Sequence, residues 1–188
     1  MQTIENSLLR VTIDEKGARM VNFVAQNDQV DYLKNSTDQK QLAVTFKKAD
    51  QEENWATLLP WTVVDKGDTR VSLALIDDAV SYKKFPYHFE IILTYALEGN
   101  RIDIKCYVKN NSHKEMPFSL SLTLPILDEW ISSENVNEVE LTDRKAKLKL
   151  TSTNFALALK NEQVIASVND VKLASDSDDE FLVTMTLN

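Results

Sequence analysis

Side chains that could exchange protons near neutral pH are scarce in this chain of 188 residues. It contains two histidines, the residue type whose unperturbed pKa lies closest to physiological pH. His88 stands in the sequence PYHFE, and His113 stands in the turn sequence NNSHKE. Carboxylates are plentiful, and the runs Asp77-Asp78 and 176–180 are typical of solvated loops. Acid–base chemistry would therefore depend on very few imidazoles or on one of many carboxylates.

Metal and nucleotide sites have spacings that this sequence lacks. The calcium pattern D-x-[DN]-x-[DN]-G does not occur, and neither GxGxxG nor GxxxxGK[ST] is present. We therefore expect no metal and no cofactor. Cys106, the single cysteine, cannot form an internal disulfide and lies in IDIKCYV on the side of Ile102 and Ile104. We expect a buried, unreactive thiol there.

The three tryptophans could bind a sugar, because the C–H faces of a pyranose pack on aromatic rings. Trp61 opens a strand-like segment and is expected in the core. Trp55 and Trp130 lie in or beside loops and are the better candidates for stacking. A place at the periphery of the core is the alternative for both.

Composition limits the partners. An apolar fraction of 43% and a charged fraction of 27% are typical of a globular protein. The net charge of -8 argues against nucleic acid and anionic membrane surfaces, which need a basic face. No apolar run approaches the roughly 20 residues that span a bilayer. The N-terminal sequence MQTIENSLLRVTID lacks the features of a signal peptide, so we expect a cytoplasmic protein.

Most segments alternate apolar and polar residues with the period of half-buried strands. In residues 85–125, three such runs are separated by the turns Glu98-Gly99-Asn100 and 110–114, which predicts an antiparallel meander. About ten to thirteen short strands predict an all-β fold, an antiparallel sandwich or barrel, formed by a single domain, 1–188. We expect at most one helical turn in 128–136.

Three isolated glycines mark turns. Gly17, Gly67 and Gly99 are each expected at a hairpin position with positive φ, which glycine adopts without a Cβ clash. Asp128 and Glu129 follow the third strand of the meander, and we expect them in a surface turn or at a helix start.

The order of these segments resembles the galactose mutarotase-like (aldose 1-epimerase) superfamily. Three stretches are similar to successive strands of that superfamily: ENSLLRVTIDEKGARMVNFV, WTVVDKGDTRVSLALIDD and FEIILTYALEGNRIDIKCYVKNNSHKEMPFSLSLTLP. The resemblance spans Glu5 to Pro125 and implies a shortened galactose mutarotase-like antiparallel β-sandwich, or supersandwich. A comparable order also occurs in the extracytoplasmic domain of bacterial membrane insertases, a non-enzymatic relative with the same sandwich.

Mutarotation, the reaction of the superfamily, needs a general acid and a general base on opposite sides of the anomeric centre. The superfamily uses a histidine and a carboxylate, and a second histidine and an arginine hold the sugar. Here the catalytic histidine position matches Thr123, whose hydroxyl cannot replace an imidazole acid. The sugar-binding histidine and arginine positions match Glu53 and Thr57, and the aromatic position is kept as Trp55. The base has no clear counterpart.

We therefore expect a divergent, non-catalytic relative of the aldose 1-epimerases. Its ligand would be a carbohydrate in a residual cleft lined by Glu53, Trp55, Thr57, Thr123 and Trp130. Because the resemblance gives neither histidine an acid–base role, we expect His88 in a structural or surface role and His113 in a solvated turn. Two alternatives stay open. One is a protein-interaction or scaffold domain without a sugar site, and the other is a true hexose mutarotase with substitute residues, for example Glu53 as the base.

Overall fold

The structure is a computed structural model that describes residues 1–34, 40–127, 130–142 and 146–188. Within these ranges the chain forms sixteen strands and two short helices. The turn or helix start expected at Asp128 and Glu129 lies outside the described residues.

The larger layer is one sheet of eight strands. They are β6 (Thr62–Lys66), β7 (Arg70–Ile76), β8 (Phe89–Glu98), β9 (Arg101–Asn110), β11 (Ile131–Asn135), β12 (Glu138–Thr142), β13 (Lys147–Ser152) and β16 (Asp178–Leu187). Their spatial order is β11-β12-β13-β16-β9-β8-β7-β6, and all neighbours are antiparallel. The first two strands of the predicted meander, β8 and β9, lie at the centre of this sheet. They pair along their full length without a register shift.

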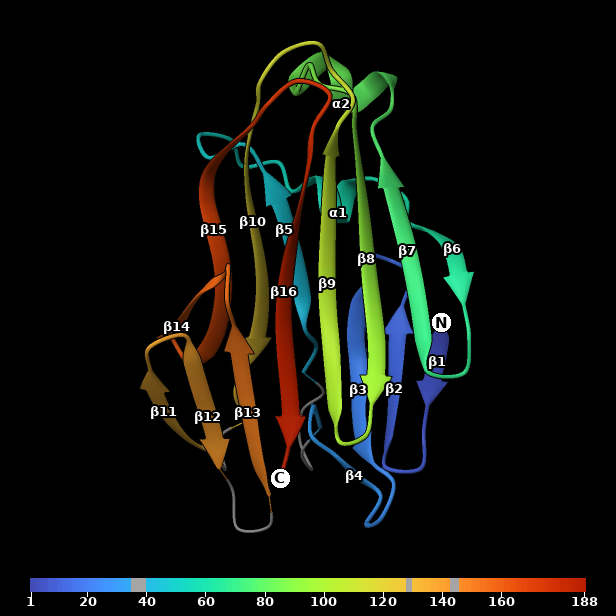
Figure 1. Ribbon diagram of the computed structural model, residues 1–188, viewed down its shortest axis with the longest axis vertical. Coiled ribbons are helices and arrows are strands. Elements are labelled where there is room, and N and C mark those ends of the chain that lie inside the picture. Colours follow the sequence, from blue (N-terminus) through green and yellow to red (C-terminus); the bar gives the residue numbers. More distant parts are fainter. Residues whose placement is uncertain (35–39, 128–129, 143–145) are drawn as a thin grey trace.

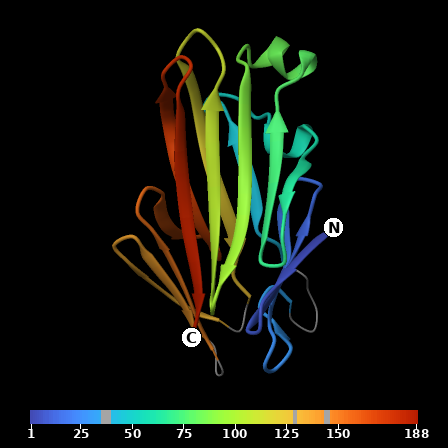
Figure 2. The ribbon, with the colours of Figure 1, turned by 45° about the vertical axis from the view of Figure 1, so that its right-hand side comes forward.

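The opposite layer contains two sheets of four strands. The first comprises β5 (Ala43–Lys47), β10 (Met116–Pro125), β14 (Ala156–Lys160) and β15 (Gln163–Leu173). The second comprises β1 (Gln2–Glu5), β2 (Leu9–Asp14), β3 (Arg19–Ala25) and β4 (Val30–Asp31). The first sheet, ordered β14-β15-β10-β5, is called the β10 sheet below. Figure 1 shows β5, β10 and β15 behind the large sheet, and the turned view of Figure 2 separates the layers.

Apolar side chains from both layers fill the space between the sheets. The ring of Phe46 on β5 lies 5.2 Å from Phe89 of the large sheet and 5.3 Å from Phe118 on β10, measured between centroids. The buried Tyr95 crosses the same space, and its hydroxyl donates to the carbonyl of Ala18 at 2.7 Å. These contacts join elements far apart in the sequence. The predicted all-β antiparallel sandwich is confirmed.

The helix α1 (Trp55–Leu58) covers one edge of the β10 sheet. The side chain of Asn54, its N-cap, donates to the carbonyl of Val44 at 3.1 Å and accepts from the N–H of Phe46 at 2.9 Å. The side-chain amide of Asn54 thus bonds the edge backbone groups of β5, to which an additional strand would otherwise pair. The second helix, α2 (Ala79–Lys84), begins at a capping box formed by Asp78 and Ser81.

Three local predictions are wrong. The third strand of the predicted meander, β10, does not pair with β9, because the chain crosses to the opposite layer after the 110–114 turn and β10 lies between β15 and β5. The helical turn considered for 128–136 does not form at Ile131–Asn135, which is strand β11, because Val136-Asn137 folds the chain back as a hairpin and Asn137 adopts φ 55°. Positive φ is confirmed at Gly17 and Gly99 but is wrong at Gly67. There, the β6–β7 loop closes with a hydrogen bond from the Gly67 N–H to the Arg70 carbonyl at 2.8 Å.

Candidate functional site

Thr123 lies near the end of β10, on the outer face of the β10 sheet. Its neighbours across the strands are Ala43 on β5 and Ile165 on β15. Leu122 and Leu124 point to the interior and are buried, so the alternation of the strand leaves Thr123 half-buried at the surface. Neither opposite position carries an imidazole or a carboxylate.

Hydroxyl groups form a row beside Thr123. Ser121 pairs with Thr45 on one side and with Ser167 on the other, and all three side chains are half-buried. Two residues earlier on β10, Ser119 accepts a hydrogen bond from the N–H of Asp170 at 3.1 Å. The row therefore offers hydrogen-bond donors and acceptors that stay uncharged near neutral pH.

A pocket of about 410 Å³ opens at the end of the β10 sheet that is nearer to Thr123. Trp130 lines it, and the Trp130 ring meets the ring of Tyr32 edge-on at 5.6 Å, which fixes the orientation of the indole. The remaining lining combines apolar side chains with a polar rim. It consists of Ile126, Leu127, Ser132, Leu159, Lys160, Asn161, Glu162 and Gln163.

Gln163 connects this pocket to the face that carries Thr123. It lines the pocket and pairs with Pro125, two residues after Thr123. The N–H of Ile126 donates to the carbonyl of Glu162 at 2.9 Å and so ties the end of β10 to the β14–β15 turn. The structure therefore places Thr123 and Trp130, two of the five expected site residues, at the same end of the β10 sheet.

The other three expected site residues lie in or just before α1. Trp55 is 3% exposed, and its indole N–H is buried without a hydrogen-bond partner among the described residues. Thr57 is exposed, donates to the carbonyl of Asn54 at 2.9 Å and lines a second pocket of about 400 Å³ with Gly17 and Trp61. That pocket shares no lining residue with the pocket beside Trp130.

Glu53, the candidate substitute base, forms an ion pair with Lys84. Its Oε1 accepts from the lysine Nζ at 2.7 Å. This hydrogen bond lowers the pKa of the Glu53 carboxyl. A general base is most effective when its pKa lies near the working pH, so the pairing makes Glu53 a weak base.

Both histidines lie at the far end of β10 from Thr123. His113 precedes the start of β10 at Met116, and seven residues of strand, about 23 Å, then separate Met116 from Thr123. His88 adjoins the same loop, because its backbone N–H donates to the hydroxyl of Ser112 at 2.7 Å.

Each imidazole is paired with an aspartate. Nδ1 of His88 lies 2.9 Å from Asp77, and Nδ1 of His113 lies 3.2 Å from Asp176. The ring of His88 also stacks on Tyr82 at 4.6 Å. These direct surface pairs leave no room for a substrate atom between acid and base.

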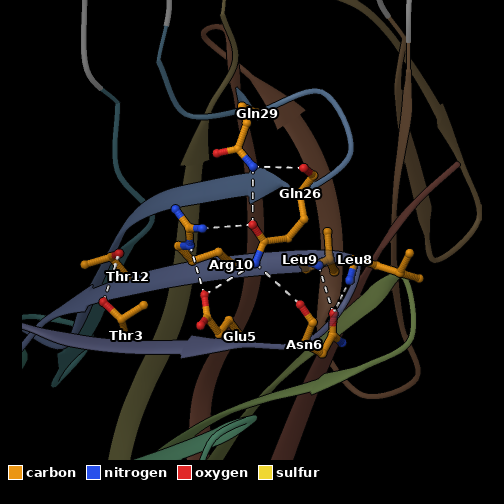
Figure 3. A network of polar contacts seen from close by, with 9 residues as sticks. All are labelled: Thr3, Glu5, Asn6, Leu8, Leu9, Arg10, Thr12, Gln26 and Gln29. Atoms are coloured by element: carbon orange, nitrogen blue, oxygen red, sulfur yellow. Dashed lines mark hydrogen bonds and ion pairs between the residues drawn. The ribbon is translucent and has the colours of Figure 1, made fainter.

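A larger polar pocket of about 580 Å³ lies between the β1–β2 and β6–β7 turns. Figure 3 shows that four of its polar residues, Thr3, Glu5, Asn6 and Gln26, already bind to each other or to neighbouring groups of the protein. Arg10 donates to Glu5 and to Gln26, both at 3.0 Å, and Asn6 accepts from two backbone N–H groups. Because these four residues are engaged within the protein and the lining contains no aromatic ring, the pocket beside Trp130 is the better candidate site.

Residues of the β14–β15 turn, which the sequence analysis did not single out, form the polar rim of this site. Asn161 and Glu162 have φ of 51° and 57°, the two left-handed residues of a type I′ hairpin turn. Asn-Gly is the usual sequence signal for such a turn. Because this turn has Asn-Glu instead, the sequence did not predict it. The hydroxyl row of β10 left a clearer signal, since Ser or Thr recurs at every second position of SLSLTL.

Glu162→Gly is expected to raise the free energy of unfolding by about 0.5–1 kcal/mol, because glycine adopts the left-handed conformation without the strain of a Cβ. Chemical denaturation would measure it. Lys160→Gly, two residues earlier in strand β14, is the matched control and should destabilise by about 0.5–1 kcal/mol. A loss of stability in Glu162→Gly would contradict the strain argument.

Among the described residues, no group of three or more His, Cys, Asp or Glu side chains could hold a metal ion. The described helices are all too short to cross a bilayer.

Comparisons with known proteins agree with the architecture. Residues 51–123, less than half of the chain, match the family model for aldose 1-epimerase. None of the curated proteins matches the chain.

Solved structures extend the likeness to the whole chain. A galactose mutarotase-like protein from Lactobacillus casei aligns with a TM-score of 0.82 and 16% identity over 100% of both chains. A galactose mutarotase related enzyme from Lactobacillus acidophilus gives 0.75 and 12% identity over 100% of this chain and 97% of its own. A galactose mutarotase-like protein from Clostridium acetobutylicum gives 0.73 and 12% identity over 99% and 94%. The predicted galactose mutarotase-like resemblance and fold are confirmed.

Proposed function

We propose that this galactose mutarotase-like chain binds a carbohydrate without catalysing mutarotation. The observation that carries the proposal is the pocket beside Trp130, where an indole held by Tyr32 faces a polar rim at the end of the sheet that carries Thr123. Aromatic rings and convergent polar side chains are the usual contacts of a small polar ligand with apolar faces. The cytoplasmic location expected from the sequence is part of the same proposal.

The proposed lack of catalysis rests on the proton-transfer groups. Thr123, which the resemblance matches to the superfamily's acid, has Ala43 and Ile165 opposite it, and neither side chain can transfer a proton. His88 and His113 lie at the other end of β10 and are bound to aspartates. Glu53, with its lowered pKa, is a poor substitute base. An acid and a base on opposite sides of one anomeric carbon are therefore not available from these residues.

Carbohydrate binding can be tested by adding galactose or glucose to about 50 mM and following backbone amide shifts by NMR, since affinities in the millimolar range are expected for such a contact. The amides of Trp130, Ser132 and Gln163 should shift with saturation. Trp130→Ala should weaken binding about tenfold, because it removes the stacking surface. Thr57→Ala, in the separate pocket, is the control and should bind like the wild type.

Shifts confined to the Thr57 pocket, or no saturable shifts with either sugar, would remove the proposed site. Polarimetry of freshly dissolved α-glucose and α-galactose tests the second part of the proposal. The rotation should decay at the rate of buffer alone. A faster decay that persists in Glu53→Gln would show that groups other than Glu53 perform mutarotation.

The alternative of a protein-interaction domain is favoured by one observation, the exposed edge strand β11. That domain would lack a sugar site, so saturable shifts at Trp130, Ser132 and Gln163 would exclude it.

A further inference from the structure

Strand β11 is a free edge of the large sheet and is exposed along its whole length. Figure 1 shows it at the outer end of that sheet. The two most exposed large apolar side chains of the described residues lie on its hairpin, with Ile131 77% and Val136 92% exposed. An unpaired edge offers backbone N–H and C=O groups to another strand.

The hairpin geometry shows which backbone groups are free. Two residues, Val136 and Asn137, connect the paired residues Asn135 and Glu138. The pair that closes a two-residue hairpin exchanges both backbone hydrogen bonds, and the pairs then alternate along the ladder. Ser132 and Glu134 therefore direct their N–H and C=O groups outward. Within the described residues, no other strand or loop makes a backbone–backbone hydrogen bond to this edge.

Two other strand edges are blocked by hydrogen bonds. On β5, the side chain of Asn54 occupies the backbone groups of Val44 and Phe46. On β1, the N–H of Glu5 donates to the carbonyl of Asp68 at 2.7 Å. Additional strands cannot pair at these positions.

Two more edges are protected in different ways. β6, at the opposite end of the large sheet, contains a bulge between Val63 and Asp65 and ends in Lys66, both of which oppose edge pairing. On β14, the outward N–H of Leu159 donates to the carboxylate of Glu134 at 3.0 Å. β11, with the sequence ISSEN, has no lysine, proline or bulge. Its one charged side chain, Glu134, is the one engaged with β14.

We infer that β11 pairs antiparallel with β11 of a second copy of this chain, so that the two large sheets become continuous. A two-fold axis at Ser133 sets Ser132 opposite Glu134 of the second copy and Ile131 opposite Asn135 of the second copy. This register joins the outward-facing residues as hydrogen-bonded pairs, with four backbone hydrogen bonds in all. It places no like charges directly opposite each other. Ile131, 77% exposed in one copy, then packs beside Asn135 of the second copy.

The dimer is weak. A five-residue edge buries less than the roughly 1,200 Å² at which stable interfaces begin. Each copy also carries a net charge of -8, which opposes association at low ionic strength. We expect a dissociation constant on the order of 0.1–1 mM that falls as salt screens the repulsion.

Sedimentation equilibrium from about 10 µM to 1 mM protein tests the inference. The average mass of the wild type should rise from that of the monomer at about 10 µM towards that of the dimer at 1 mM, where roughly half to four fifths of the chains are paired. Ser132→Pro should stay monomeric, because it removes an outward N–H without breaking a hairpin hydrogen bond. Ser132→Ala keeps that N–H and should dimerise like the wild type. Ser133→Lys, which keeps every backbone group, sets two ammonium groups at the two-fold axis and should raise the dissociation constant at least tenfold.

A wild type that stays monomeric at 1 mM in about 0.5 M salt overturns the inference. So does a dimer that persists in both Ser132→Pro and Ser133→Lys, because it must use another surface. Far-ultraviolet circular dichroism of each variant separates loss of pairing from loss of the fold. The inference does not depend on sugar binding, and either can fail alone.

Discussion

Asn110→Ala is expected to lower the free energy of unfolding by about 3–5 kcal/mol. The Asn110 side chain is 0% exposed at the end of β9. Its Nδ2 donates to the carbonyls of Lys114, Leu173 and Ala174 at 2.8, 3.1 and 3.0 Å, and its Oδ1 accepts from the N–H of Ser112 at 2.9 Å. Alanine would leave several buried backbone groups without partners, each at a cost of about 1–3 kcal/mol.

The neighbouring residue gives a matched control. Asn111 is exposed, and among the described residues it bonds only through its backbone N–H, to the carbonyl of His88. Asn111→Ala should change the free energy of unfolding by less than about 0.5 kcal/mol. Urea denaturation followed by tryptophan fluorescence measures both variants. Equal stabilities of the two variants would mean that water replaces the Asn110 amide at little cost.

Asn110 also illustrates what local patterns can and cannot reveal. The sequence marked residues 110–114 as a turn, and the structure confirms that β9 ends at Asn110. The carbonyls of Leu173 and Ala174 lie more than 60 residues further along the chain. Periodicity describes one strand at a time, so it cannot show which distant segment closes the end of the sandwich.

The same limit explains the candidate site. The sequence resemblance matched the superfamily's catalytic histidine position to Thr123, and alternation along β10 put Thr123 and Ser121 on one face. The partners Thr45 and Ser167 come from strands 76 residues before and 46 residues after Ser121, and only the register shows them. Register between distant strands depends on the packing of the whole layer.

Trp55 and Trp130 looked alike in the sequence, because both stand beside loops. Trp55 opens α1 and is buried against β5, whereas Trp130 lines a pocket. The difference comes from Asn54, whose amide holds α1 against the edge of β5. A side-chain cap of that kind is a tertiary contact, so neither tryptophan could be placed by pattern alone.

The buried thiol of Cys106 has the largest expected effect on a chemical rate. Burial between the sheets raises its pKa from 9.0 to about 12. The thiolate is the reactive form, so its fraction at pH 8 should be about a thousandfold lower in the native protein than in the unfolded chain. Labelling by an aromatic disulfide reagent should therefore require unfolding, and guanidinium should release one reactive thiol per chain.

The same pKa fixes a pH dependence. Above pH 9 the thiol of the unfolded chain loses its proton, while the native thiol keeps its proton until about pH 12. The native state then binds more protons, so the free energy of unfolding falls with rising pH, by up to about 1.4 kcal/mol per unit from this group. Cys106→Val keeps the apolar contact and cannot ionise, and Tyr95, whose pKa burial also raises, remains in both proteins. The difference in free energy of unfolding between wild type and Cys106→Val should therefore be constant below pH 9. Above pH 9 the wild type should lose stability relative to Cys106→Val. A constant difference up to pH 11, or rapid labelling of the native protein at pH 8, would show that water reaches the space between the sheets at Cys106.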